Sequence, residues 1–179
     1  MVLFENSMVW LRGYMKVERL IVGDLEENCY ILTKNNKTLI IDPGDESTKI
    51  INFCKNKNVI GVLVTHHHFD HIGALNEICK YFNVCEVEMA EGFDFEVIKN
   101  PGHSSDSKSY YFKDEKIMFC GDFIFFNSIG RTDLPGGNVK DMMSSLTMIC
   151  KYPDDIILYP GHGPSTLLGH EKNNFKYYF

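Results

Sequence analysis

The chain has 179 residues and a formal charge of −6 at pH 7, and 44% of its residues are hydrophobic. This length suffices for one domain with a sizeable core. The acidic balance, without any run of Lys and Arg interleaved with aromatic residues, argues against a nucleic-acid-binding surface. No apolar run approaches the roughly 18 residues of a transmembrane helix, which argues against a membrane partner.

Hydrophobic periodicity and turn residues predict the secondary structure in chain order. Strands are expected near 16–22, 28–33 and 38–41, then a helix near 47–57, a strand over 59–64, a helix near 72–82, strands near 84–89, 93–98, 108–112 and 116–121, a helix over 139–151, a strand near 156–159 and a short helix after Ser165. Runs of strands with interspersed helices fit two sheets, each covered by helices.

The two ends of the chain stand apart from this pattern. Residues 1–14 form an N-terminal extension in which Val9, Trp10 and Leu11 could pack onto the body, although a short translated leader is the favoured interpretation. The domain itself then spans residues 15–179. Its aromatic tail is expected to pack on this same domain rather than on a partner.

The six cysteines are scattered without a CxxC pair. Most lie in apolar stretches, where a free thiol behaves as a small hydrophobe. Because there is also no credible signal peptide, we expect structural thiols in a reducing cytoplasm rather than disulfides or a redox role.

The most informative segment is Thr-His-His-His-Phe-Asp-His at 65–71. It lies between a predicted strand and a predicted helix, so it is a loop that can bring His66, His68, Asp70 and His71 to one point. Imidazole nitrogen and carboxylate oxygen are ligands that zinc, iron and manganese prefer. Asp70 would lie near the N-terminus of the helix, where free N–H groups favour a carboxylate. The segment therefore predicts a metal site.

Three further predicted strands end with a possible ligand. A Pro-Gly pair precedes His103 and His162, and a glycine precedes Asp122. Glycine lets the backbone turn sharply and approach an ion closely. Side chains at successive strand ends tend to converge on one rim of a sheet. Together with the histidine-rich loop, these positions are hard to explain by turn chemistry alone.

The order HxHxDH, His, Asp, His resembles the motif pattern of the metallo-β-lactamase superfamily. Thr-Leu-Ile-Ile-Asp-Pro-Gly at 38–44 resembles the first motif of that superfamily. The resemblance extends from about Met15 to Glu171, which is most of the chain. It implies an α/β fold built as a four-layer αββα sandwich.

The resemblance also implies two divalent ions per chain, which could be zinc, iron or manganese. It assigns the first ion to His66, His68 and His103 and the second ion to Asp70, His71 and His162. Asp122 would bridge the two ions, so Asp70 and Asp122 are the predicted catalytic residues. Asp42 would support the site without being a ligand, and His67 would face away. Two carboxylates and one hydroxide make the cluster nearly neutral, so it can be partly buried.

A pair of divalent ions can lower the pKa of a shared water to near neutrality, and the bridging hydroxide can then attack a carbonyl. A thioester suits this chemistry because the leaving thiol has a pKa of about 8.5 and needs no protonating side chain. Segment 128–137, SIGRTDLPGG, resembles the SIGRTD loop of glyoxalase II-like and persulfide dioxygenase-like branches. Asn-Cys-Tyr at 28–30 and segment 160–166 resemble small glyoxalase II-like hydrolases. Arg131 could clamp a substrate carboxylate, or it could brace its own loop through Asp133.

We therefore expect a hydrolase of thioesters of the S-(2-hydroxyacyl)glutathione type, acting as a monomer or homodimer. The alternatives are a mononuclear iron persulfide dioxygenase and a non-catalytic metal-binding domain. Two departures leave the thiol carrier open. The chain ends seventeen residues after His162, whereas glyoxalase II has a helical C-terminal domain that contacts glutathione. Only Glu86–Gly92 separates two predicted strands where relatives often carry a longer insertion. The entrance to the active site would therefore be more open or completed by another subunit.

Overall fold

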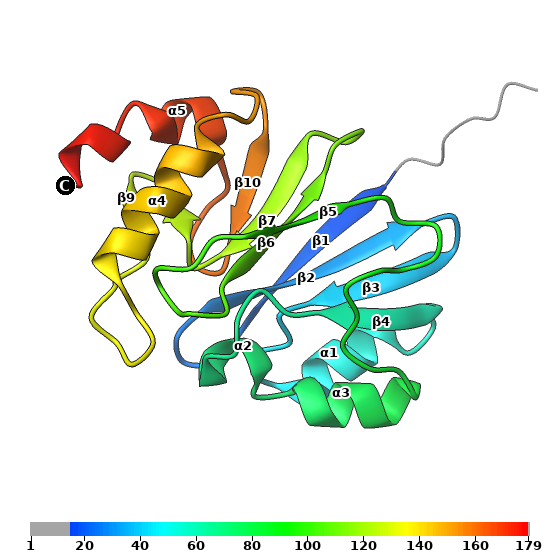
Figure 1. Cartoon of the computed structure of the whole chain (residues 1–179). Helices are drawn as coiled ribbons and strands as arrows, with labels where there is room; N and C mark the ends of the chain where they lie inside the picture. The colour runs from blue at the N-terminus through cyan, green and yellow to red at the C-terminus, as the bar shows by residue number, and fades with distance from the viewer. Residues whose placement is uncertain (1–14, 179) are drawn as a thin grey trace, which may run out of the picture.

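The architecture is taken from a computed structural model that describes residues 15–178; the extension 1–14 and Phe179 lie outside the described residues. Two β-sheets pack face to face, and helices cover the outer face of each sheet (Figure 1). The expected αββα sandwich is therefore confirmed. Among the described residues, no helix has the length and apolar character needed to cross a membrane.

The first sheet has the order β1-β2-β3-β4. Its strands are β1 (Lys16–Val22), β2 (Glu27–Lys34), β3 (Lys37–Ile41) and β4 (Val59–Leu63). The first three strands are antiparallel, and β4 lies parallel to β3. The outer helices on this side are α1 (Ser47–Cys54), the single turn α2 (Phe69–Ile72) and α3 (Leu75–Phe82).

The second sheet has the order β11-β10-β7-β6-β5. Its strands are β5 (Glu96–Lys99), β6 (Lys108–Phe112), β7 (Ile117–Gly121), β10 (Ile157–Pro160) and β11 (Thr166–Leu167). A hairpin of β8 (Ile124–Phe125) and β9 (Ser128–Ile129) follows β7. The covering helices are α4 (Val139–Ile149), α5 (Leu168–Lys172) and a 3₁₀ turn (Phe175–Tyr177). In both sheets three antiparallel strands are followed by a helix and a parallel strand, so the halves share one topology.

Three apolar layers hold these elements together. The layer between the sheets is aromatic, with Tyr30, Tyr110, Phe112 and Phe119 all buried. Strand β2 alternates between layers: Tyr30 and Leu32 face the other sheet, whereas Ile31 packs under α1 and α3. Burial on both faces explains why the central strands are nearly continuous apolar runs in the sequence.

The structure corrects several predicted boundaries. Segment 84–89 is not a strand; it makes one bridge, between Glu86 and Val62, with backbone hydrogen bonds that join Val62 to Cys85 and Val87. The helix predicted over 72–82 is broken in two. At Gly73 a side chain would meet the carbonyl oxygen of Gly44 at 2.3 Å, so the chain bends around that backbone before α3 begins. The β8–β9 hairpin was not predicted.

The chain ends are partly as expected. Phe175 in the tail is buried, and Tyr178 packs against the layer between the second sheet and its helices. This confirms that the tail packs on its own domain. Asp70 lies in the first turn of α2, near the helix N-terminus where the sequence placed it.

Candidate metal centre

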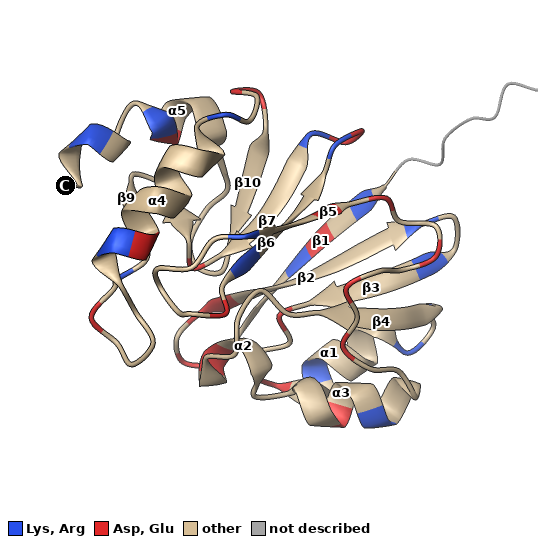
Figure 2. Ribbon diagram, in the orientation of Figure 1, with Lys and Arg blue, Asp and Glu red and all other residues tan. Residues whose placement is uncertain are grey.

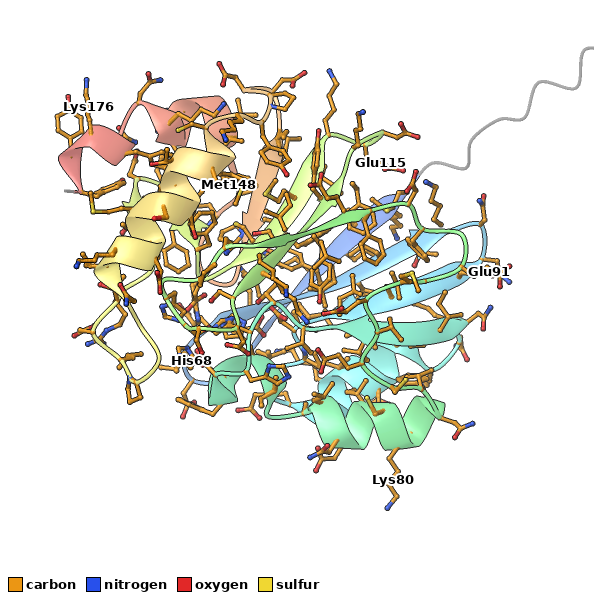
Figure 3. All side chains as sticks on the ribbon, viewed as in Figure 1. His68, Lys80, Glu91, Glu115, Met148 and Lys176 are labelled. Carbon is orange, nitrogen blue, oxygen red and sulfur yellow. The ribbon has the colours of Figure 1, made fainter. Side chains whose placement is uncertain are left out.

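The predicted ligands gather where strands end, at one edge of the two sheets. The loop that follows β4 carries His66 and His68, α2 carries Asp70 and His71, and the segments that follow β5, β7 and β10 carry the other three. Figure 3 labels His68 beside α2 at this edge. The structure thus brings together all seven side chains that the sequence singled out, although their ligand role remains a prediction.

Three histidines form the first group. The Nε2 atom of His66 lies 3.1 Å from Nδ1 of His68, and Nε2 of His103 lies 2.9 Å from that same Nδ1. A tetrahedral ion with metal–nitrogen bonds of about 2.05 Å separates its ligand nitrogens by about 3.3 Å. Two of the three nitrogen pairs therefore stand close to the spacing that one ion requires, and all three nitrogens lie within 4.8 Å of one another.

The second group is slightly wider. The Nε2 atom of His162 lies 3.3 Å from Oδ2 of Asp70, and Nε2 of His71 lies 4.0 Å from it. Asp122 lies between the groups: its Oδ1 is 3.3 Å from His71 Nε2 and its Oδ2 is 3.5 Å from His103 Nε2. One carboxylate therefore faces both groups, which is the position a bridge would occupy.

Two atoms of this cluster test whether a cation fits. His71 Nε2 and Asp122 Oδ1 are buried, and neither has a hydrogen-bond partner of good geometry among the described residues. A buried polar atom left without a partner costs about 1–3 kcal/mol. A divalent ion between the two atoms would satisfy both, and imidazole with carboxylate suits zinc, iron or manganese. The residues present therefore fit such ions.

Four histidines are held through the ring nitrogen that faces away from the centre. The Nδ1 atoms pair as follows: His71 with Asp42 Oδ2 at 3.0 Å, His103 with the Arg131 carbonyl at 2.8 Å, His162 with the Leu25 carbonyl at 3.0 Å, and His66 with Thr65 Oγ1 at 3.1 Å. Metal-binding histidines commonly make such bonds, which fix the tautomer and the ring orientation. His68 differs because it turns Nδ1 itself inward.

Asp42 occupies the predicted supporting position behind His71. Its Oδ1 accepts a hydrogen bond from the Thr65 backbone N–H at 2.7 Å, and its Oδ2 accepts one from the Thr65 hydroxyl at 2.6 Å. The backbone of Asp42 is left-handed, with φ of 48°. A non-glycine residue holds such a conformation only where its surroundings fix it, as these bonds do.

The pKa shifts of the cluster favour the metal-binding forms of two predicted ligands and the protonated form of a third. Burial alone would raise the pKa of Asp122, yet the facing His71 holds that pKa well below its usual range. Burial opposes protonation of His71, but contact with Asp122 and Asp42 raises its pKa well above its usual value. Burial and the positive His71 lower the pKa of His66 to about 3. Asp122 is thus anionic and His66 neutral, the forms that bind metal, whereas His71 must lose its proton before it can bind an ion.

His67 and Arg131 both point away from the centre. The Nδ1 atom of His67 lies 2.6 Å from Asp106, and its Nε2 atom lies 3.2 Å from Glu86. The Arg131 side chain is 62% exposed and donates two hydrogen bonds to Asp133, of 2.7 and 2.8 Å. Arg131 therefore reaches the cluster through its carbonyl oxygen, which holds His103, and not through its guanidinium.

Sequence reasoning missed the residues that join the two sheets at this edge. The Asn28 amide donates to the carbonyls of Pro160 and Gly163, each at 2.9 Å, and the Tyr30 hydroxyl donates to Pro160 at 2.7 Å. These bonds hold the loop that carries His162. The Asn-Cys-Tyr motif was visible in the sequence, but its partners lie about 130 residues away, so the contact was not.

Glu27 was also missed. Its side chain is buried 4.0 Å from His71 Nδ1, and neither carboxylate oxygen has a hydrogen-bond partner in the described part of the chain. Burial raises its pKa well above the usual value. A buried carboxyl group whose pKa is raised therefore lies behind the predicted ligands. In the sequence, a glutamate at the start of a strand gives no local sign that its side chain is buried beside the predicted ligands.

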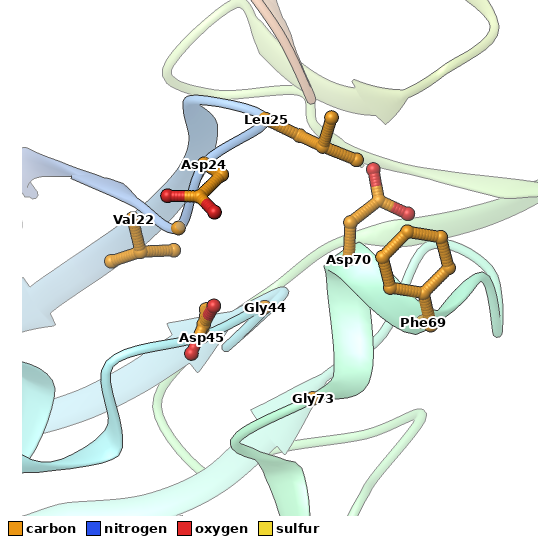
Figure 4. A pocket seen from close by; sticks show the side chains of 9 residues that line it. Val22, Asp24, Leu25, Gly44, Asp45, Phe69, Asp70 and Gly73 are labelled. Carbon is orange, nitrogen blue, oxygen red and sulfur yellow. The ribbon is translucent and has the colours of Figure 1, made fainter.

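One pocket of about 260 Å³ opens beside Asp70 (Figure 4). Its walls include Asp24 and Asp45, with Leu25 and Phe69 at the rim. Figure 2 shows acidic segments near the β1–β2 turn and α2. No Lys or Arg is among the residues that line this pocket in the described structure. This side of the metal centre is therefore acidic.

The family model described as the metallo-beta-lactamase superfamily matches residues 22–93 and 86–162. The chain belongs to that superfamily, and its members' use of divalent metals agrees with the cluster described above.

Three similar proteins are informative. Hydroxyacylglutathione hydrolase GloC of Haemophilus influenzae is 28% identical, and the match covers 89% of this chain and 96% of GloC. The B3 metallo-beta-lactamase BLEG-1 superposes with a TM-score of 0.84 at 28% identity, over 90% of this chain and 99% of BLEG-1. TTHA1623, solved in a di-iron-bound form, superposes with a TM-score of 0.81 at 28% identity, over 88% and 98% of the two chains.

Proposed function

We propose that the protein is a binuclear metallohydrolase that cleaves thioesters of the S-(2-hydroxyacyl)glutathione type. The observation that carries the proposal is the pair of ligand groups with Asp122 between them, within 3.3–3.5 Å of a nitrogen from each. The similarity to GloC over nearly its whole length supports the choice of substrate class.

When bound, a pair of divalent ions supplies a nucleophilic hydroxide near neutral pH and polarises the carbonyl of the substrate. In the overall reaction, water adds its oxygen to the carbonyl carbon. The C–S bond breaks with its electron pair on sulfur, and a carboxylic acid and a thiol are released. A thiol of pKa about 8.5 leaves without a proton donor, so the site needs no general acid.

The residues of the chain would hold the ions and orient the ligand side chains. His66, His68 and His103 would hold one ion, and Asp70, His71 and His162 the other, with Asp122 shared. The hydrogen bonds to the outer ring nitrogens keep the imidazoles oriented while substrate enters. His68 and His162 are partly exposed. Access is therefore from the side of α2 and the loop after β10.

The stoichiometry of metal tests the binuclear model. Protein isolated from its native host should contain close to two equivalents of zinc, iron or manganese in some mixture. A ceiling of one equivalent after incubation with excess metal contradicts the binuclear model. We also propose a reducing cytoplasm as the location, because the six cysteines are scattered without a CxxC pair. We propose a monomer or homodimer that needs neither nucleic acid nor membrane.

Hydrolysis is tested with metal-reconstituted protein and a thioester panel. S-Lactoylglutathione, S-acetylglutathione and a coenzyme A thioester are incubated with enzyme, and the released thiol is titrated. We expect turnover of S-lactoylglutathione that is abolished by a chelator and restored by metal. Nitrocefin is included because BLEG-1 is named a metallo-beta-lactamase. Turnover of nitrocefin without turnover of any thioester would refute the proposal.

One observation favours a mononuclear iron dioxygenase as the second candidate. The nitrogens of the first group lie 2.9–3.1 Å apart, whereas contacts in the second group run from 3.3 to 4.0 Å. One ion in the tighter group with Asp122 is the arrangement such an enzyme would need. Oxygen consumption with glutathione persulfide, at one iron per chain, distinguishes it from the hydrolase.

A further inference from the structure

A groove of about 440 Å³ lies beside His162 and shares no lining residue with the acidic pocket. It is lined by Phe125, Phe126, Ser128, His162, Gly163 and Pro164. Two phenylalanines, a proline and the flat face of an imidazole make its walls largely apolar. The volume lies in the range of small-molecule sites.

The wall of the groove is held firmly. Phe126 is 50% exposed at the turn of the β8–β9 hairpin, and its ring stacks on His170 at 5.7 Å with an angle of 12° between the planes. His170 Nε2 lies 2.8 Å from the Asn127 side-chain oxygen, and the Asn127 N–H donates to the buried Glu171 at 3.0 Å. The exposed phenyl ring thus stacks on a histidine that is itself hydrogen-bonded, and a ring restrained in this way loses less entropy when a ligand binds.

His162 connects the groove to the metal centre. Its Nε2 atom faces Asp70 at 3.3 Å and Asp122 at 3.7 Å, while its ring also lines the groove. The Phe125 ring stands edge-on to it at 6.3 Å. The groove and the predicted ligand cluster therefore share one side chain, that of His162.

The surroundings decide which part of a thioester fits there. A glutathione carrier brings two carboxylates and an ammonium group, and an apolar groove offers these poor solvation. The pocket beside Asp70 has Asp24 and Asp45 in its walls, so it suits carboxylates no better. An apolar acyl substituent matches the groove, because burying it on Phe125, Phe126 and Pro164 removes apolar surface from water.

We propose that this groove is the acyl subsite, and that it selects thioesters whose acyl group carries an apolar or aromatic substituent. The inference rests on the proposed thioester hydrolysis and deepens it. A methyl substituent would leave most of the groove empty, whereas a phenyl ring would contact both phenylalanines. The preferred substrates would therefore be 2-hydroxyacyl thioesters larger than lactoyl.

The kinetic test compares S-mandeloylglutathione with S-lactoylglutathione, which differ only by phenyl in place of methyl. The ratio of their kcat/KM values is measured for the wild type, Phe126→Ala, Phe126→Leu and the control Tyr81→Ala. Tyr81 is an exposed aromatic residue on α3. Intrinsic reactivity cancels when the ratios of two proteins are compared. We expect the ratio to fall about tenfold in Phe126→Ala, less in Phe126→Leu, and not at all in the control; tenfold is about 1.4 kcal/mol.

A binding test does not depend on turnover. Mandelate and lactate are titrated calorimetrically into metal-loaded protein. We expect mandelate to bind at least fivefold more tightly than lactate, and this preference to disappear in Phe126→Ala. If no thioester is hydrolysed but the preference holds, the subsite stands and the proposed function fails.

If thioesters are hydrolysed but Phe126→Ala leaves both preferences unchanged, the proposed function stands and the subsite is refuted. Sedimentation tests the remaining possibility, which is that a second copy of this chain occupies the groove. A dimer that Phe126→Ala dissociates, with no change in either preference, would make the groove a subunit interface and overturn the proposal.

Discussion

Gly161 is a position where the smallest possible substitution should displace two predicted ligand side chains directly. A β-carbon placed there would lie 2.4 Å from Asp122 Oδ1 and 2.4 Å from Cε1 of His71. To restore contacts of 3.0–3.4 Å, these side chains must retreat by 0.6–1.0 Å, whereas metal–ligand distances tolerate about 0.2 Å. A misplacement of about 1 Å can cost about 100-fold in rate. We expect Gly161→Ala to lower metal affinity and kcat/KM at least about 100-fold, equivalent to about 2.8 kcal/mol.

Gly163 provides the matched control two residues away. Its φ is +74°, and no described atom lies within 4 Å of an added β-carbon. Gly163→Ala therefore introduces backbone strain of about 1 kcal/mol without a clash. Both variants are compared with the wild type for metal content after dialysis against a calibrated chelator, and by circular dichroism and melting. Gly163→Ala should melt lower but keep its metal. If Gly161→Ala binds metal as tightly as the wild type, the clash argument is wrong.

Three further predictions concern the network around the ligands. Asp122→Ala should lose activity and most of its metal with an unchanged circular dichroism spectrum, whereas Asp42→Ala should first lower the melting temperature, since it removes three buried hydrogen bonds; equal, mild effects would contradict these roles. If the guanidinium of Arg131 binds a substrate carboxylate, Arg131→Lys should raise KM more than it lowers kcat. The loss of binding should be about 1–3 kcal/mol. This loss should be smaller for a thioester that lacks that carboxylate. An equal loss of activity with all substrates, together with a lower melting temperature, would mean that Arg131 only stabilises its own loop. The hydrogen bond to Asp106 raises the pKa of His67. The stabilisation of the fold by protonated His67 is therefore complete below pH 6.5 and is lost as the pH rises through the raised pKa. His67→Ala should therefore lower the stability of metal-free protein at pH 5.5, by under about 1 kcal/mol because the side chain is half exposed, and progressively less above pH 7; a deficit that grows with pH would contradict this.

The ligand pattern was predictable because its signals are local. Each candidate ligand follows an apolar run, and a strand that ends in a turn places the next polar side chain at the sheet edge. Asp70 and His71 lie in α2, whereas the sequence placed them in the loop before a helix that was expected to begin near residue 72. The αββα arrangement followed from the order of strands and helices together with the family resemblance, rather than from periodicity alone.

The parts that could not be predicted depend on distant backbone. The helix break at Gly73 exists because the chain must pass the Gly44 carbonyl. The bonds that orient His103 and His162 end on the carbonyl oxygens of Arg131 and Leu25. Any residue type can offer a carbonyl, so neither sequence position carries a signal. The substrate role of Arg131 stays a prediction, since its fork is engaged by Asp133.

The metal centre is assembled from both sheets. The half that contains β4 supplies four of the predicted ligands, and the half that contains β5, β7 and β10 supplies the other three. Bonds across the sheets hold the halves in register, including Tyr110 Oη to the Val64 carbonyl at 2.8 Å and Asn28 to Pro160 at 2.9 Å. Ligands from one half alone could hold an ion in a locally folded loop. Asp122 cannot act as a bridge in such a loop, because it meets His71 only when the two sheets are packed. Occupancy of the shared position is therefore coupled to sheet packing, and ions bound there stabilise the fold by mass action.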